Sequence, residues 1–145
     1  MDIFSSLRVS ASGLDAQTKR MNTISSNLAN SETTRTEEGG PYRRKDPVFQ
    51  ASADRETFGE ILQDTIDQNI EGVLVTDIVE DQRAPRLVYN PQHPDANGEG
   101  YVAMPHVNVV EEMANMISAQ RSYEANITAM GAAKAMAQKA LELGR

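Results

Sequence analysis

The sequence predicts a mainly α-helical chain with a small β-rich middle module, in which long N- and C-terminal helices pair as a coiled coil. Heptad-spaced apolar side chains occupy both ends, a turn-rich acidic segment separates them, and only 5% of the 145 residues are aromatic. Because aromatic side chains normally supply much of a globular core, a large core is not expected. The predicted boundaries are an N-terminal helix in residues 1–30, a loop and β-rich module in residues 31–104, and a C-terminal coiled-coil helix in residues 105–145.

The N-terminal helix is predicted over Ile3–Leu28. Its main apolar residues recur at strict seven-residue spacing and are Leu7, Leu14, Met21 and Leu28. The intermediate heptad positions are mostly small or polar, so the seam is shallow and the helix needs a packing partner. The C-terminal helix supplies such a partner within the chain, and the same surfaces could equally pair between chains.

The middle segment is predicted to form short strands joined by turns. Apolar and β-branched runs predict strands at residues 47–52, 73–79 and 87–89. A short amphipathic helix is predicted within residues 55–70, from the spacing of Phe58, Ile61, Leu62 and Ile66. Residues 90–100 are rich in Pro, Gly and Asn, which predicts a loop.

The C-terminal helix is predicted from about Asn108 to Leu143. An unbroken alternation of four-residue and three-residue steps predicts a coiled-coil seam, which at 1.5 Å per residue is about 50 Å long. The seam consists of Val109, Met113, Met116, Gln120, Tyr123, Ile127, Met130, Lys134, Ala137 and Leu141. Asn108 followed by Glu111 gives the helix a capping-box-like start. A seam of this length needs a partner of similar length.

The formal net charge of −7 comes from the middle of the chain. Residues 31–100 contain fifteen acidic and seven basic side chains, whereas both ends are nearly neutral. Neutral ends suit helices that pack against protein, whereas a nucleic-acid-binding chain would carry a basic face. One basic triplet, Arg43, Arg44 and Lys45, is interpreted as a possible contact for a partner, with plain solvation as the alternative.

No arrangement of residues in the sequence indicates catalysis or a cofactor. The chain has no Cys, no nucleophile elbow and no phosphate-binding Gly loop. Asp95, Asn97 and Glu99 imitate the start of an EF-hand loop, but His106 occupies the position that needs a bidentate Glu, which favours a plain loop. His93 and His106 lack a third ligand for zinc. The sequence therefore predicts a protein that is not an enzyme and holds no metal or cofactor.

The N-terminus does not have the composition of a secretory signal peptide. An acid, Asp2, follows Met1, and no unbroken apolar region comes after it. The chain also contains no run of about 18 apolar residues that could span a bilayer. We therefore expect a cytosolic protein or one that leaves the cell by a route without a cleaved signal.

Two long stretches carry a resemblance to a known family. Residues 12–30 (SGLDAQTKRMNTISSNLAN), followed by Thr33 and Thr34, closely resemble the N-terminal signature of bacterial flagellar axial proteins of the rod and hook. Residues 116–126 (MISAQRSYEAN) resemble the C-terminal signature of that family. The segments that are similar to its proximal rod members are residues 40–45, 89–94, 100–105 and 107–113. The short length also fits a proximal rod protein better than the longer hook or distal rod proteins.

The resemblance implies a structural subunit of the flagellar rod, the drive shaft that crosses the periplasm and carries torque from the motor to the hook. It implies export by the flagellar type III apparatus without a cleaved signal, and assembly into a helical tube that motility requires. The implied partners are other copies of the chain, the proximal rod proteins FlgB and FlgF, the distal rod protein FlgG and the rod-base adaptor FliE. Neither nucleic acid nor direct membrane insertion is implied.

In this interpretation the terminal helices pack subunits together as well as folding each subunit. The expected packing residues are Leu7, Leu14, Met21, Leu28, Val109, Met113, Met116, Ile117, Tyr123, Ile127, Met130 and Leu141. The alternative is a cytosolic coiled-coil adaptor or a flagellar export chaperone. That alternative predicts a stable helical monomer or dimer in dilute solution, whereas a rod subunit should have protease-sensitive termini that become ordered on assembly.

Overall fold

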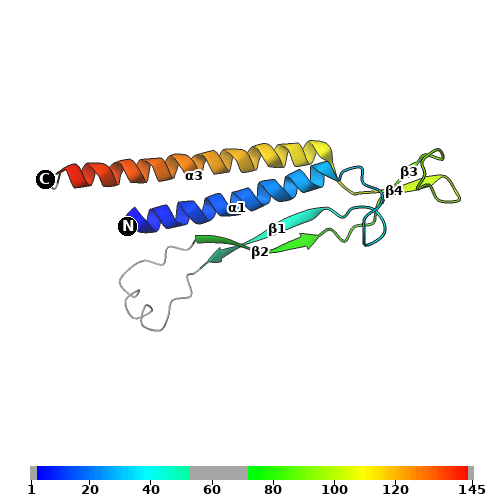
Figure 1. The fold of residues 1–145 in the computed structure, drawn as a ribbon, viewed down its shortest axis with the longest axis horizontal. Coiled ribbons are helices and arrows are strands. Elements are labelled where there is room, and N and C mark those ends of the chain that lie inside the picture. The colour runs from blue at the N-terminus through cyan, green and yellow to red at the C-terminus, as the bar shows by residue number, and fades with distance from the viewer. Residues whose placement is uncertain (1–2, 53–71, 144–145) are drawn as a thin grey trace, which may run out of the picture.

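The computed structural model describes residues 3–52 and 72–143, and it confirms the predicted fold class. Helix α1 spans Ile3–Ala29 and helix α3 spans Val109–Leu143, close to the predicted bounds. The two helices run antiparallel and side by side, so that the start of α1 lies near the end of α3 (Figure 1). No helix in the described ranges is long and apolar enough to cross a bilayer.

In the described residues, four strands form two separate antiparallel pairs, and all four lie between the two helices in the sequence. Strand β1 (Lys45–Ser52) pairs with β2 (Gly72–Glu80), and β3 (Arg86–Tyr89) pairs with β4 (Tyr101–Met104). The strands predicted at residues 47–52, 73–79 and 87–89 are confirmed. Strand β4 lies in a segment for which the sequence predicts no strand. The helix predicted within residues 55–70 lies outside the described residues.

Helix α1 lies between two layers. It contacts α3 on one side and both strands of the β1–β2 hairpin on the other, whereas α3 has no such contact with either strand (Figure 1). The hydroxyl oxygen Oγ of Ser12 accepts a hydrogen bond from the backbone N–H of Val73 at 3.1 Å and so ties α1 to β2. The buried apolar residues of the described chain are few and are Ala16, Ile24, Val102, Ala119 and Ala133. The core is therefore thin, as the low aromatic content predicts.

The face of α3 that packs on α1 is displaced by one residue from the predicted seam. The buried and half-buried residues that follow four-residue and three-residue steps are Glu112, Met116, Ala119, Tyr123, Asn126, Met130, Ala133 and Ala137, and Asn115 and Ser122 beside them are also half-buried. Four of the ten predicted seam positions are thus correct: Met116, Tyr123, Met130 and Ala137. The other predicted positions are exposed to solvent: Val109, Met113, Gln120, Ile127, Lys134 and Leu141. The spacing identified the correct period but the wrong partner positions.

Small side chains explain this displacement. A Cβ atom built on Gly13 of α1 would lie 2.9 Å from Nδ2 of Asn126 on α3, so the Asn126 side chain packs in space that Gly13 leaves by having no side chain. Ala119 and Ala133 are also small and are 0% and 3% exposed. Of the larger side chains of the predicted seam, Met116, Tyr123 and Met130 are half-buried in the contact, whereas Val109, Met113, Ile127 and Leu141 lie outside it. On α1, the predicted apolar stripe of Leu7, Leu14, Met21 and Leu28 is half-buried.

The β3–β4 hairpin projects from the end of the molecule where α1 ends and α3 begins (Figure 1). Tyr89 on β3 and Tyr101 on β4 lie opposite each other, and their rings meet edge to face with centroids 5.3 Å apart. In its loop, Asn97 Oδ1 accepts hydrogen bonds from the backbone N–H groups of Glu99 and Tyr101. Gly100 adopts a φ of 83°, which only Gly accepts without strain.

Candidate assembly interface

A buried polar cluster lies where the helices meet the β-rich module. Asn27, near the end of α1, is 0% exposed, and Glu112, in the first turns of α3, is 1% exposed. The Nδ2 group of Asn27 donates to Glu112 Oε2 at 3.1 Å and to the backbone oxygen of Lys45 at 2.8 Å. The Oδ1 atom of Asn27 accepts from Tyr42 Oη at 3.0 Å and from the backbone N–H of Lys45 at 2.9 Å. One side chain thus joins α1, α3 and the start of β1.

Arg44 supplies the positive charge that the buried Glu112 carboxylate needs. Its Nε donates to Glu112 Oε1 at 2.8 Å, and its Nη1 also pairs with Asp46. Burial by itself lowers the pKa of Arg44, but the hydrogen bonds and charges of Glu112 and Asp46 outweigh that effect and raise the pKa above its ordinary value. The Arg44 side chain therefore remains charged, and the pair is hydrogen-bonded as buried charges require.

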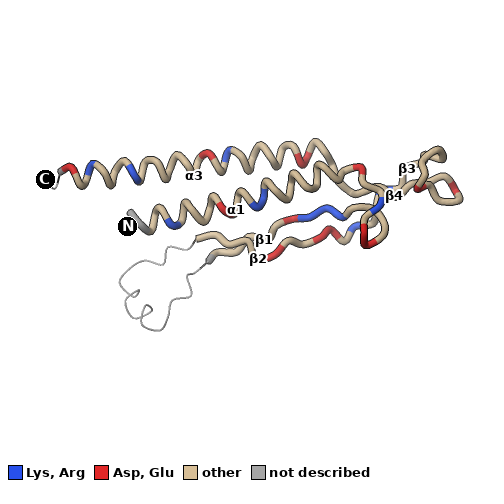
Figure 2. The backbone as a smooth tube through the Cα atoms, in the orientation of Figure 1, with Lys and Arg blue, Asp and Glu red and all other residues tan. Residues whose placement is uncertain are grey.

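The three residues of the basic triplet have different partners in the structure. Arg44 is occupied within the chain by Glu112 and Asp46. The Nζ of Lys45 lies 3.3 Å from Glu80, and Arg43 is exposed with one guanidinium nitrogen 3.4 Å from the backbone oxygen of Asp81. Figure 2 shows these basic residues side by side at the start of β1, close to the acidic residues of β2. A contact between this triplet and a partner remains a prediction, for which Arg43 has the most exposed side chain.

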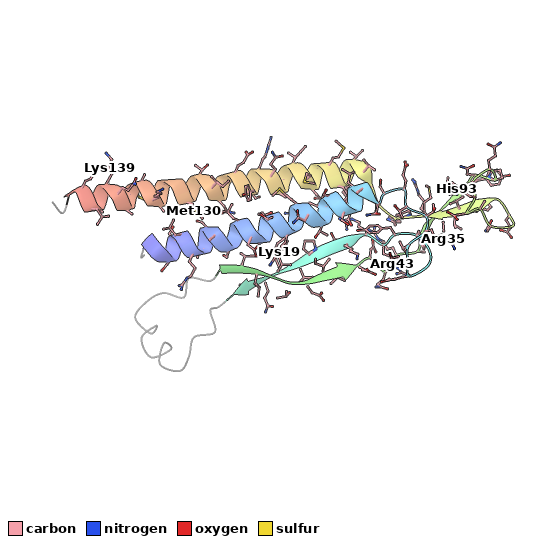
Figure 3. The ribbon with its side chains drawn as sticks, in the orientation of Figure 1. Lys19, Arg35, Arg43, His93, Met130 and Lys139 are labelled. Atoms are coloured by element: carbon pink, nitrogen blue, oxygen red, sulfur yellow. The ribbon has the colours of Figure 1, made fainter. Side chains whose placement is uncertain are left out.

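The side of α3 that faces away from α1 is apolar at its N-terminal end. Val110, Met113 and Ile117 are 74%, 53% and 54% exposed. Further exposed apolar residues on this helix are Val109, Ile127, Met136 and Leu141. Figure 3 shows Met130 between the two helices and Lys139 on the opposite side of α3. Apolar side chains therefore occur around the whole helix, although α1 covers only one face.

The β1–β2 hairpin carries a second exposed apolar surface. Phe49 on β1 and Leu74, Ile78 and Val79 on β2 are each 40–48% exposed. Only one face of a two-stranded sheet can pack on α1, so apolar side chains elsewhere on the hairpin stay exposed. Exposed apolar side chains in such number on two elements are typical of protein contact surfaces.

Polar side chains of the loops stabilise turns. Asp81 accepts hydrogen bonds from the guanidinium group and the backbone N–H of Arg83, and these lower the pKa of Asp81 to about 2. The Nδ1 atom of His93 accepts from the backbone N–H of Asp95, whose carboxylate accepts from Thr34 at 2.7 Å. Within the described ranges, no three His, Cys, Asp or Glu residues are grouped so that they could hold a metal ion.

Sequence reasoning missed Asn27, Tyr42 and Glu112, the central members of the cluster. A signal for Glu112 was present, because the spacing that includes Met116 and Ala119 places position 112 on the inner face. Asn27 had no such signal, since a polar residue near a helix end is usually exposed or caps the helix.

Two regions of the chain match protein-family models. Residues 7–35 match the family described as flagella basal body rod protein, and residues 99–143 match the family described as flagellar basal body rod FlgEFG protein C-terminal. The chain is 48% identical to the flagellar basal-body rod protein FlgC of Bacillus subtilis over 152 residues, a match that covers 100% of both chains. It is 43% identical to the FlgC of Borreliella burgdorferi, in a match that covers 99% of this chain and 98% of that protein. It is 42% identical to the FlgC of Salmonella typhimurium, in a match that covers 94% of each chain.

Proposed function

Because the chain belongs to the FlgC family of flagellar basal-body rod proteins, we propose that it packs into the rod through the sides of α3 that α1 leaves exposed. The family resemblance of the two terminal signatures is thereby confirmed. The protein is a structural subunit of the flagellar rod, and it belongs to the basal body with the other rod proteins.

The observation that carries this proposal is the distribution of apolar residues around α3. A helix with apolar side chains on all sides is normally buried on all sides. In the isolated chain α1 covers one face, and Val110, Met113 and Ile117 remain exposed on the other. Neighbouring subunits are the partners that would cover these side chains. Heterologous contacts of this kind, repeated with a rotation that does not close, generate a helical tube.

Such packing suits the transmission of torque. Long helices with interdigitating side chains make many contacts at once, and closely packed protein interiors are poorly compressible. In this proposal, residues 1–30 and 105–145 form the inner helical layer of the tube. Residues 31–104 form the module outside that layer, with Arg43 and Lys45 available to neighbouring subunits.

The neighbours and the location in the cell follow from the same proposal. The partners are other copies of the chain, the rod proteins FlgB, FlgF and FlgG, and the adaptor FliE. The subunit passes through the flagellar type III export apparatus without a cleaved signal and joins the rod where it crosses the periplasm. The role is structural and needs neither catalysis nor a cofactor.

Substitution of one exposed residue on α3 tests the proposal. In cells, Ile127→Asp should abolish incorporation into rods and swimming, because Ile127 is 48% exposed in the chain and a carboxylate would be buried against a neighbour. Leu14→Asp should have the same effect. The matched control is Ile127→Val, which keeps an apolar side chain, and a second control is His93→Ala on the distant hairpin. Both control strains should swim. Normal swimming by the Ile127→Asp strain, with the variant present in purified basal bodies, would contradict the proposal.

A further inference from the structure

The polar cluster is assembled from three segments that lie far apart in the sequence. Asn27 comes from the end of α1, Glu112 from the start of α3, and Tyr42, Arg44 and Lys45 from the segment that leads into β1. The separation between Asn27 and Glu112 is 85 residues, and that between Arg44 and Glu112 is 68 residues. Any two of the three segments leave at least one buried group without one of its hydrogen-bond partners.

The buried groups have their full set of hydrogen-bond partners only when all three segments are in place. Without α3, the Arg44 side chain loses Glu112, and Asn27 loses one acceptor. Without α1, the Glu112 carboxylate loses an N–H donor, and the first backbone N–H of β1, that of Lys45, loses its acceptor. Buried polar groups without partners are costly, so the cluster closes as a unit.

We propose that this cluster couples the order of the β-rich module to the pairing of the terminal helices. When α1 and α3 pair, Asn27 and Glu112 come together and fix Tyr42, Arg44 and Lys45, which sets the position at which β1 leaves the helical layer. When the helices separate, the start of β1 is released. The adjoining turn is released with it, because the backbone N–H of Asp81 donates to the backbone oxygen of Arg44 at 2.8 Å and so links the turn to this segment.

The meaning of this coupling for assembly rests on the proposed function. A subunit whose helices pair only when it joins the rod would also acquire the final orientation of its module at that moment. A free subunit would then present an incomplete module surface to its partners. This order of events disfavours premature contacts between modules away from the growing rod.

An engineered disulfide tests the coupling in the purified full chain. The protein contains no cysteine, so a Gly13→Cys and Asn126→Cys pair is the only thiol pair in the molecule. These positions lie against each other, since a Cβ on Gly13 would contact the Asn126 side chain. Oxidation links α1 to α3 covalently, and reduction removes that link. The readout is the hydrogen-exchange rate of the Lys45 amide, with the Tyr101 amide, bonded to Asn97 in the β3–β4 hairpin, as internal reference.

Oxidation should slow exchange of the Lys45 amide by about tenfold or more and leave the Tyr101 amide unchanged. The difference should disappear when Glu112→Gln or Asn27→Ala is added, because the cluster then cannot close. It should persist with Glu111→Gln, which changes an exposed carboxylate one residue away. If the cysteine pair does not oxidise, Ala119→Asp opens the same helix interface by placing a carboxylate at a fully buried site, and it should accelerate Lys45 exchange.

Two results would overturn the inference. One is equal Lys45 exchange in the oxidised and reduced forms, or, for the second variant, unchanged exchange in Ala119→Asp. The other is a redox difference that survives Glu112→Gln or Asn27→Ala. Because the assay uses the purified chain, its failure would leave rod incorporation unaffected. A failure of incorporation by Ile127→Asp would in turn leave this assay unaffected.

Discussion

Ile117 and Ala119 are two residues apart on α3, yet they lie on opposite faces of it, since successive residues turn by roughly 100° around a helix. Ala119 is 0% exposed against α1, whereas Ile117 is 54% exposed. A chain that used its largest apolar residues for its own folding would have the opposite arrangement. The comparison teaches that small side chains occupy the most buried positions of the α1–α3 contact, and that large apolar side chains such as Ile117 are left for other contacts.

A pair of adjacent carboxylates provides the largest expected contrast between the two faces. Glu112→Ala removes the buried carboxylate that pairs with Arg44 and accepts from Asn27, and it should destabilise the chain by about 2–4 kcal/mol, since Arg44 keeps Asp46 as a partner. Glu111→Ala removes an exposed carboxylate and should change the free energy of unfolding by less than about 0.5 kcal/mol. Urea unfolding followed by far-ultraviolet circular dichroism measures both. Equal effects of the two substitutions would mean that the cluster does not stabilise the fold.

A pair of alanines on α3 should give an intermediate contrast. Ala119→Leu adds three carbon atoms to a fully buried contact with α1 and should cost about 1–3 kcal/mol through overpacking. Ala125→Leu adds the same atoms at an exposed position and should have an effect below about 0.5 kcal/mol. The same unfolding measurement compares them. A neutral Ala119→Leu would show that small size is not what the α1–α3 contact requires.

The smallest expected effect concerns a turn outside both faces. The pKa of Asp81 is about 2 in the folded chain against an ordinary value of 3.8, because Arg83 hydrogen-bonds its charged form. A lowered pKa stabilises the folded state fully above the ordinary pKa, and this contribution is lost as the pH falls from about 4 through about 2. Asp81→Asn should remove that pH-dependent contribution. Stability measured against pH should therefore fall less steeply in the variant than in the parent over this interval, and parallel curves would refute the assignment.

Periodicity and turn composition were sufficient to predict most of the fold. Both helices and three of the four strands follow from apolar spacing and from the Pro- and Gly-rich loop at residues 90–100. Strand β4 is short, lies next to Pro105, and pairs with β3 along its length, with the Tyr101 ring against that of Tyr89. A contact of this kind cannot be read from one short run of residues.

The inner face of α3 was harder to predict, because two seams one residue apart have four members in common. Apolar character favours the seam through Met113 and Ile127, whereas the observed seam runs through Ala119 and Asn126. The choice depends on the fit of the Asn126 side chain against Gly13, which is a property of the folded pair. The buried cluster was missed for the same reason, since Asn27 and Glu112 look like surface residues until the helices are placed together.

Thiol labelling at position 117 tests the central claim most directly. The parent chain has no cysteine, so Ile117→Cys introduces one thiol on the side of α3 that faces away from α1. The rate of maleimide labelling of this chain is measured by mass spectrometry in the purified subunit and in purified basal bodies. The account predicts rapid labelling of the free subunit and strong protection in the rod. Equally rapid labelling in both states, with the variant fully incorporated, would contradict the claim that this face of α3 packs against neighbouring subunits.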